Sequence, residues 1–134
     1  NHYTPFQLID ALLAGQAKRS QRILRQLQAE GVEATILLRT LQRELTQLYK
    51  MQEMGKKGTP LNLIFEQFRV WQNRREMYIG VLHRLSLTTL VTIIRQLTLL
   101  EIQVKTDYDT QPWSALSCLC AEMCGITTHL QPRN

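Results

Sequence analysis

The chain has 134 residues, of which 44% are hydrophobic and 20% are charged, and its formal net charge is +5 at pH 7. These proportions are typical of a globular protein, and a chain of this length can bury roughly two thirds of the surface that it exposes when unfolded. No apolar run approaches the ~18 residues that a membrane span needs, and no signal-peptide pattern opens the chain, so we expect no membrane partner and no secretion.

The N-terminal part of the chain predicts two short helices joined by a tight turn. The first helix begins after Thr4 with Pro5, since proline is favoured at the first helical position, and it closes at Gly15. The second covers residues 17–30, with its apolar side chains on one face, and Gly31 ends it. The basic side chains on its other face are Lys18, Arg19, Arg22 and Arg25.

A long helix is predicted over residues 33–54, because leucine and isoleucine recur there at intervals of three and four residues. The expected inward side chains are Ile36, Leu37, Leu38, Leu41, Leu45 and Leu48. The basic side chains off that face are Arg39, Arg43 and Lys50. Residues 55–58 hold Lys56 and Lys57 between two glycines, and we expect the clearest break of the chain there.

Two more helices are predicted between residues 59 and 85. Thr59 and Pro60 repeat the cap and proline pattern of the first helix. The apolar residues of this helix are Leu61, Ile64, Phe65 and Phe68. Asn73 is the expected N-cap of the next helix, over residues 74–85.

The segment WQNRR, residues 71–75, joins these two helices and combines a large aromatic side chain with two arginines. Tryptophan and arginine are enriched at the centres of protein interfaces, so Trp71, Arg74 and Arg75 are candidate contacts with a partner. Adjacent residues cannot share one helix face, so one arginine is expected to bond inward and the other outward. The alternative is a core Trp71 beside arginines that only solvate a corner.

Residues 86–107, SLTTLVTIIRQLTLLEIQVKTD, predict a long and unusually apolar helix with Ser86 as its N-cap. Its apolar side chains spread over roughly 200° of the helix surface, about twice the stripe of an ordinary surface helix. We therefore expect this helix to contact several neighbours and to gather the other helices around itself.

A last helix is predicted over residues 113–124, after Pro112, and Gly125 ends it. Residues 131–134 are expected to fray. With short connections and no alternating strand pattern, the sequence predicts an all-α fold: a single helical bundle of six to seven helices that forms one domain over residues 1–134.

The spacing of the cysteines suggests a metal site, but the geometry of a helix argues against it. Cys118, Cys120, Cys124 and His129 can be written as C-x-C-x3-C-x4-H. On a helix, however, Cys118 and Cys120 point about 200° apart, whereas structural zinc sites take paired cysteines from a tight turn. We expect three buried cysteines in a reducing cytoplasm and no bound metal.

No constellation of catalytic residues is recognisable. The three histidines are scattered, no glycine-rich phosphate-binding loop follows a strand, and no serine lies in a nucleophile elbow. The expectation is no catalytic activity in this chain and no cofactor.

Glu101 interrupts the apolar arc of the long helix over residues 86–107. A carboxylate in such a place must be paired or lie at a seam, because burying it alone is costly. An internal ion pair is favoured over contact with a partner subunit, and its possible cations are Arg39, Arg43, Arg74 and Arg75. Lys105, one turn later, is in the favourable orientation for a second pair.

The basic residues are unevenly distributed: residues 18–84 hold thirteen basic and six acidic side chains. Such a bias is compatible with a surface that faces phosphates, so a nucleic-acid-binding helical module is an alternative function. The candidate basic surface comprises Lys18, Arg19, Arg22, Arg25, Lys56 and Lys57.

Several segments, in this order and spacing, resemble the C-terminal domain of the bacterial DNA polymerase III delta subunit. They are DALLAG at residues 10–15, AKRSQRILRQL at 17–27, ILLRTLQREL at 36–45, RVWQNRR at 69–75, and Glu101 with Lys105 followed by Asp107 and Tyr108. The resemblance covers nearly the whole chain, which makes it more specific than any one motif.

The resemblance implies a component of the clamp loader, the pentameric complex that places the sliding clamp on primed DNA during replication. In that family the third domain is a helical collar that joins the subunits, and delta-type subunits lack a working ATP site. The implied partners are subunits of the gamma/tau and delta-prime types, the sliding clamp and primed DNA would be contacted by the parent complex, and the implied location is the bacterial cytoplasm. The collar of a gamma or delta-prime subunit is a further alternative.

Two expectations follow for this chain. Because Asn1 is not methionine, we expect a C-terminal fragment of a longer protein. The candidate residues for a subunit interface or an ion pair are Arg39, Arg43, Trp71, Arg74, Arg75 and Glu101.

Overall fold

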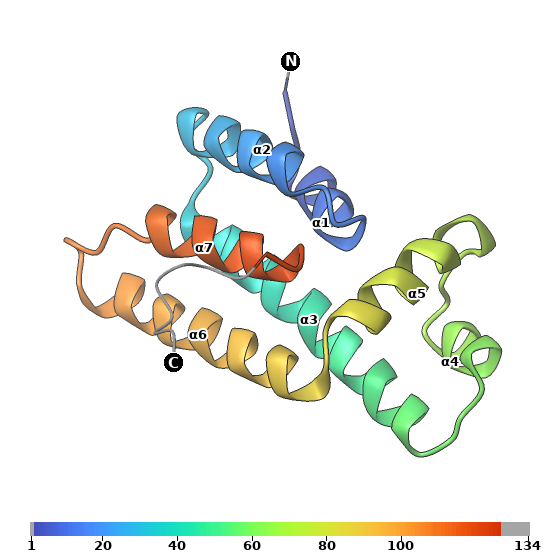
Figure 1. Ribbon diagram of the computed structural model, residues 1–134. Coiled ribbons are helices and arrows are strands. Elements are labelled where there is room, and N and C mark those ends of the chain that lie inside the picture. Colours follow the sequence, from blue (N-terminus) through green and yellow to red (C-terminus); the bar gives the residue numbers. More distant parts are fainter. Residues whose placement is uncertain (1, 127–134) are drawn as a thin grey trace.

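The computed structural model describes residues 2–126 of the chain, and this part contains seven α-helices, one 3-10 turn and no strand (Figure 1). The elements are α1 (Pro5–Leu13), α2 (Ala17–Ala29), α3 (Ala34–Lys56), α4 (Leu61–Gln67), the turn η1 (Gln72–Arg74), α5 (Arg75–Arg84), α6 (Leu87–Thr106) and α7 (Trp113–Met123). The predicted all-α helical bundle is confirmed. His129 and the predicted fraying of residues 131–134 lie outside the described residues.

The longest helix, α3, is the centre of the bundle. It contacts α1, α4 and α6, while α2 packs on α1 and α7 (Figure 1). Its buried stripe consists of Leu37, Leu38, Leu41, Leu45, Leu48 and Met51. α6 lies antiparallel to α3, since Gln52 bonds the carbonyl of Leu85 before α6 begins and Arg39 bonds Glu101 near its end. Each end of α3 is thereby fixed to the opposite end of α6.

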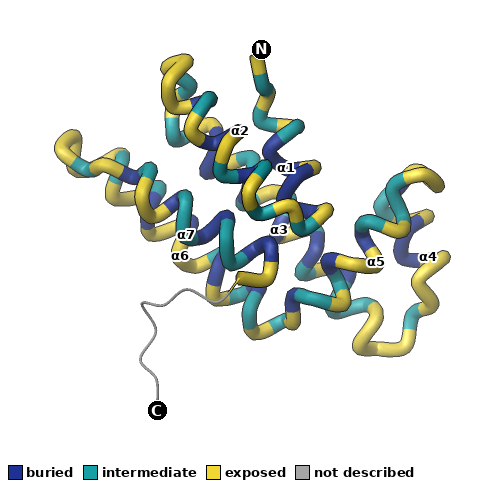
Figure 2. The backbone as a smooth tube through the Cα atoms, turned by 45° about the horizontal axis from the view of Figure 1, so that its top comes forward, coloured by how far each residue is buried: buried dark blue, intermediate teal, exposed yellow. Residues whose placement is uncertain are grey.

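The expectation that residues 86–107 gather the other helices is wrong. α6 packs mainly on α3 through Leu90, Ile93, Leu97 and Leu100, and it contacts α7 more lightly. Its outer face is left in solvent, where Leu99 is 59% and Ile102 is 52% exposed; Figure 2 shows the alternation of buried and exposed residues along α6. An apolar arc shows which surface avoids water, but it does not show whether the covering partner lies in the same chain.

α6 is also the one described helix that is long and apolar enough to cross a membrane by length and composition. Four of its residues are buried, and it packs mainly on α3, but only 22% of its most apolar stretch is buried. Arg95 and Glu101 interrupt its apolar sequence.

The helix boundaries follow local signals with a few corrections. Thr4 caps α1 in a reciprocal capping box with Gln7, and the Ser86 hydroxyl accepts a hydrogen bond from the Thr89 amide, as predicted. α3 extends to Lys56, into the predicted break at residues 55–58, and the turn follows at residues 57–58. Asn73 lies within η1 and caps nothing, because Arg74 is the residue before α5. The expected inward side chain Ile36 is 50% exposed, because at 100° per residue it lies outside the stripe of α3 that the buried leucines form.

The cysteines belong to the packing of α7. Cys120 and Cys124 are buried and Cys118 is half-buried. Burial raises the pKa of the Cys120 thiol to about 12, so this thiol stays protonated. Residues 2–126 contain no group of three side chains that could hold a metal ion.

A single guanidinium joins the C-terminal ends of α1 and α7. Arg84 donates from Nη2 to the carbonyls of Leu12 (3.0 Å) and Leu13 (3.3 Å), and from Nε to the carbonyl of Met123 (3.2 Å). The last carbonyls of a helix have no partner within the helix and carry partial negative charge, so a cation satisfies them well. Gly125 follows α7 with φ +93°, and a Cβ there would come within 2.8 Å of Arg84 Cδ. Glycine is therefore required for this close approach.

Candidate interaction surface

An open groove runs along the exposed face of α3; we call it the α3 groove. Its volume is about 620 Å³, and it is lined by Arg39, Gln42, Arg43, Thr46, Gln47 and Lys50 of α3 and by Gln67, Phe68 and Arg69 at the end of α4. The α3 residues recur at intervals of three and four, which places them on one stripe of the helix. The buried leucines occupy the opposite stripe, so the periodicity that forms the core also aligns these polar side chains.

The α3 groove is lined by basic residues and by no acidic one. Arg43, Lys50 and Arg69 are exposed, and none of them forms an ion pair within residues 2–126. Arg39 and Arg43 were predicted as candidate residues, whereas Lys50 and Arg69 were not. The structure brings all four to one surface, because Arg69 approaches α3 from the far end of α4.

Arg69 has an unusual backbone conformation, with φ +56°, and it is the one non-glycine residue with positive φ among those described. It follows α4 in a hydrogen-bonded turn in which the Val70 amide donates to the Phe65 carbonyl at 2.8 Å and the Arg69 amide donates to the Glu66 carbonyl at 3.2 Å. Glycine is the usual residue at such a helix end, and a side chain there costs about 1 kcal/mol. The position thus carries an arginine where local stability favours glycine.

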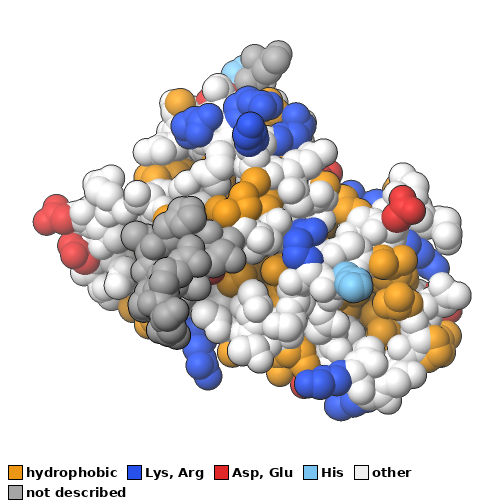
Figure 3. All heavy atoms as spheres, viewed as in Figure 1, with side chains coloured by type: hydrophobic (Ala, Val, Ile, Leu, Met, Phe, Trp, Pro, Cys, Tyr) orange, Lys and Arg blue, Asp and Glu red, His pale blue; other side chains and the backbone are white. Residues whose placement is uncertain are grey.

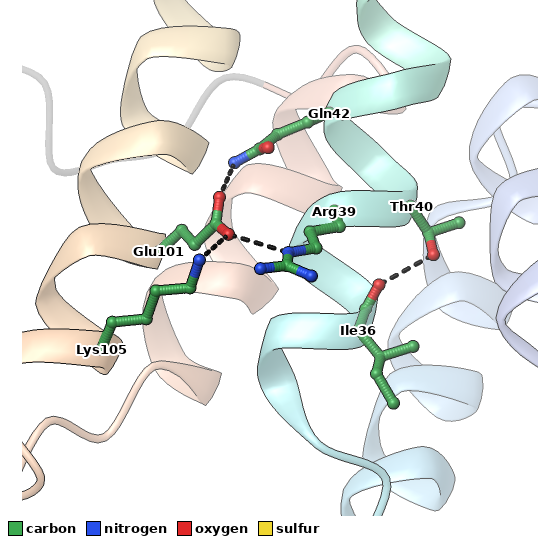
Figure 4. A network of polar contacts seen from close by, with 6 residues as sticks. All are labelled: Ile36, Arg39, Thr40, Gln42, Glu101 and Lys105. Carbon is green, nitrogen blue, oxygen red and sulfur yellow. Dashed lines mark hydrogen bonds and ion pairs between the residues drawn. The ribbon is translucent and has the colours of Figure 1, made fainter.

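At one end of the α3 groove, Arg39 and Gln42 belong to a network around Glu101 (Figure 4). The carboxylate accepts hydrogen bonds from Lys105 (2.8 Å), Arg39 (3.0 Å) and Gln42 (3.0 Å). These bonds, with Lys105 the largest contributor and then Arg39 and Gln42, lower the pKa of Glu101 to about 2. The predicted alternatives are thus resolved in favour of an internal pair, and the cation from α3 is Arg39.

Replacing Glu101 with glutamine should lower the free energy of unfolding at pH 7 by about 1 kcal/mol, because Arg39 and Lys105 are largely solvated and solvent screens the pairs. The folded-state pKa lies below the ordinary 4.5. The wild-type contribution is therefore complete above pH 4.5 and is lost as the pH falls toward 2. Urea unfolding of both proteins at several pH values measures this. A wild-type advantage that persists unchanged at pH 2 would contradict the assignment.

The other end of the groove leads to the segment before α5. A second hollow, of about 350 Å³, shares Gln47, Phe68 and Arg69 with the α3 groove and is also lined by Val70, Trp71, Arg74 and Tyr78. Trp71 is 74% exposed, so the alternative of a core tryptophan is wrong. The hydrogen bonds of Val70 and Arg69 to the end of α4 fix the turn that holds Trp71 outward.

The two adjacent arginines hold this segment to the bundle. Arg74 donates to Asp10 on α1 at 2.9 Å, and this bond is the first cause that raises the pKa of Arg74. Arg75 donates from Nε to the Val70 carbonyl at 3.1 Å and lies over the ring of Phe65. Arg75 thus bonds inward, as expected for one of the pair, while Arg74, instead of bonding outward, also bonds within the chain, to Asp10 of α1.

The predicted basic surface does not form one surface. Lys18, Arg22 and Arg25 are exposed on α2, and Arg19 lies over the ring of Tyr3. Lys56 and Lys57 are at the end of α3. Figure 3 shows basic side chains gathered over α2 at the top of the view, away from those near the C-terminal end of α3.

Comparison with known proteins identifies the family. Residues 5–129 match the family model described as the processivity clamp loader gamma complex DNA pol III C-term. The DNA polymerase III subunit delta of Escherichia coli K12 is 46% identical over 123 residues, which cover 92% of this chain and 36% of the relative. The same subunit of Haemophilus influenzae Rd is 40% identical over 130 residues, which cover 91% of this chain and 38% of the relative.

A more distant relative agrees with these two. The DNA polymerase III subunit delta of Buchnera aphidicola from Acyrthosiphon pisum is 25% identical over 121 residues, which cover 90% of this chain and 36% of the relative. The chain thus spans about a third of the length of its curated relatives. All three relatives are delta subunits, which favours this family over the alternatives of gamma or delta-prime. The chain belongs to the family of C-terminal domains of the DNA polymerase III processivity clamp loader, in its delta-subunit branch.

Proposed function

We propose that this chain is the helical collar domain of a clamp-loader delta subunit, which holds the subunit in the ring of the loader. The match to the family over residues 5–129 carries the proposal. The fold supports it, because the described residues form a helical body whose surface presents interface-type side chains. We infer no catalytic role for the chain. Within the bacterial cytoplasm, its partners would be the gamma/tau and delta-prime subunits, and the parent complex would contact the sliding clamp and primed DNA.

The outer face of α6 is the part of the surface that we assign to a neighbouring subunit. Leu99 and Ile102 lie one turn apart and are both more than half exposed. Large apolar side chains that adjoin on one face mark interaction sites more often than isolated ones do. Trp71 and Arg43 remain further candidates, since both are exposed, whereas Arg74, Arg75 and Glu101 are engaged within the chain.

Reconstitution of the loader tests this function. The complete natural chain should form a larger species with gamma/tau and delta-prime subunits on size exclusion with light scattering. A double change of Leu99→Glu and Ile102→Glu should weaken this assembly by about tenfold or more, because two carboxylates would be buried unpaired. The matched control is Leu63→Glu on α4, which is also about half exposed (54%). Assembly that is insensitive to the α6 change would exclude this face as the contact.

The nucleic-acid-binding alternative receives less support. Its six basic residues are divided between α2 and the distant end of α3, so they do not present one continuous path to a phosphate backbone.

A further inference from the structure

We propose that the α3 groove is a docking site for a short acidic segment of a partner protein, with Arg43, Lys50 and Arg69 as its carboxylate-binding residues. This inference does not depend on the collar function, since it concerns the chemistry of the groove itself. It rests on three observations about the groove: its unpaired cations, the backbone conformation of Arg69, and the ion pairs that flank it.

The unpaired cations show what the groove lacks. Arg43, Lys50 and Arg69 line it and have no ion-pair partner within residues 2–126. Two flanking arginines each hold a carboxylate from another segment: Arg39 in the groove lining binds Glu101 at 3.0 Å, and Arg74 in the adjoining hollow binds Asp10 at 2.9 Å. This surface therefore already binds carboxylates at both ends, and its middle presents the same kind of donor without an acceptor.

The backbone conformation of Arg69 is a second observation that points to a ligand. Its φ of +56° favours glycine, and the turn after α4 would form at least as well with glycine. Nothing that Arg69 bonds inside the described chain offsets this cost, because its backbone makes the hydrogen bonds of the turn and its guanidinium forms no ion pair there. An unfavourable conformation that persists at a surface cleft points to a ligand.

The ends of the groove favour a peptide over a nucleic acid. Arg39 at one end is paired with Glu101, and Arg74 in the adjoining hollow is paired with Asp10, so the groove's cations without an ion pair among the described residues are confined to the stretch between them. A phosphate backbone continues in both directions and would extend past this stretch. A short acidic segment would not. The neutral lining of Gln42, Thr46 and Gln47 also suits hydrogen bonding to a peptide backbone.

The dimensions set the length of the segment. Arg39 and Lys50 are separated by about 16 Å along α3, at a rise of 1.5 Å per residue. An extended peptide covers this distance with about five residues at roughly 3.3 Å each. Phe68 is half-buried in the wall and offers an apolar contact to one side chain of such a segment.

Fluorescence anisotropy on the complete natural chain tests the proposal. The probe is a fluorescein-labelled peptide of about seven residues with glutamate at most positions, long enough to span the groove. Its matched control has glutamine in place of glutamate. The glutamate peptide should bind at low ionic strength, binding should weaken with added salt, and the glutamine peptide should not bind.

Variants locate the binding. The double variant Arg43→Gln and Lys50→Gln should lower the affinity for the glutamate peptide by about tenfold or more, as expected for the loss of two charge-assisted contacts. Arg69→Gly should lower the peptide affinity without loss of thermal stability, because glycine suits the backbone conformation at that position. This variant therefore separates an effect on binding from an effect on folding. Lys18→Gln with Arg22→Gln on α2 makes the same change in net charge and should leave binding within about twofold.

Three outcomes would overturn the proposal. One is no binding of the glutamate peptide at low salt. Another is equal weakening by the α2 variant, which would show attraction to net charge alone. The last is tighter binding of a single-stranded thymidylate oligonucleotide that is lost in the same groove variants, which would assign the groove to phosphates.

Discussion

Replacing Arg84 with methionine is expected to lower the free energy of unfolding by about 3 kcal/mol, the largest effect that we predict for a single polar side chain here. Methionine keeps much of the apolar stem but leaves the carbonyls of Leu12, Leu13 and Met123 without this donor. It also removes a cation from the negative ends of α1 and α7. Burial lowers the pKa of the Arg84 guanidinium, and arginine side chains stay charged in proteins. Urea unfolding followed by circular dichroism measures the change.

Two companion variants test whether the loss of stability in Arg84→Met comes from the hydrogen bonds of the Arg84 guanidinium. Arg95→Met removes an exposed arginine from α6 and should change stability by less than about 0.5 kcal/mol. Arg84→Lys keeps the charge, but lysine lacks the planar fork of arginine and cannot reach all three carbonyls. Its free energy of unfolding should therefore lie between those of the wild type and the methionine variant. A loss below about 1 kcal/mol for Arg84→Met would show that water replaces the guanidinium at both helix ends.

Gly125→Ala should be the second most damaging change, with an expected loss of about 2 to 3 kcal/mol. Two costs add at this position. The backbone has φ +93°, and the new Cβ would lie 2.8 Å from Arg84 Cδ, on a side chain that three hydrogen bonds hold in place. Thermal and urea unfolding of the variant measure the total.

Gly58 provides a matched control for this change. Its φ is +95°, nearly that of Gly125, but a Cβ there would have nothing within 4 Å. Gly58→Ala should therefore show only the backbone cost of about 1 kcal/mol. The excess at Gly125 should vanish when Arg84 is also replaced by alanine, since the obstructing atoms are then gone. Equal losses for the two glycine variants would disprove the close packing of Arg84 against Gly125.

Local signals in the sequence predict the helices well and their arrangement less well. Thr4 and Ser86 fix helix starts through hydrogen bonds within one turn, and Pro5 does so through its restricted φ, so these boundaries could be predicted. The role of α3 as the centre of the bundle could not be predicted. α3 and α6 both carry strong apolar stripes, and the periodicity of a stripe does not show which neighbouring helix covers it. The exposed Leu99 and Ile102 were indistinguishable from core residues for the same reason.

The candidate surface was predicted in part. Residue type alone selected Arg39, Arg43 and Trp71, and the structure places them along the two adjoining hollows. Arg69 was missed because its approach to α3 depends on how α4 folds back, although an arginine in a short connection without glycine is a signal that could have drawn attention. Arg84 was missed because its three acceptors lie at the ends of helices far away in the sequence.

The bond between Arg84 and both terminal helices has a consequence for biosynthesis. A ribosome releases α1 first and α7 last, so the end of α1 can bond Arg84 once α5 has emerged, whereas Arg84 can bond Met123 only after α7 has emerged. Until then, nascent α1 and α2 lack the surface of α7 against which α2 packs. The domain should mature late in translation, as one event that follows the release of its final helix.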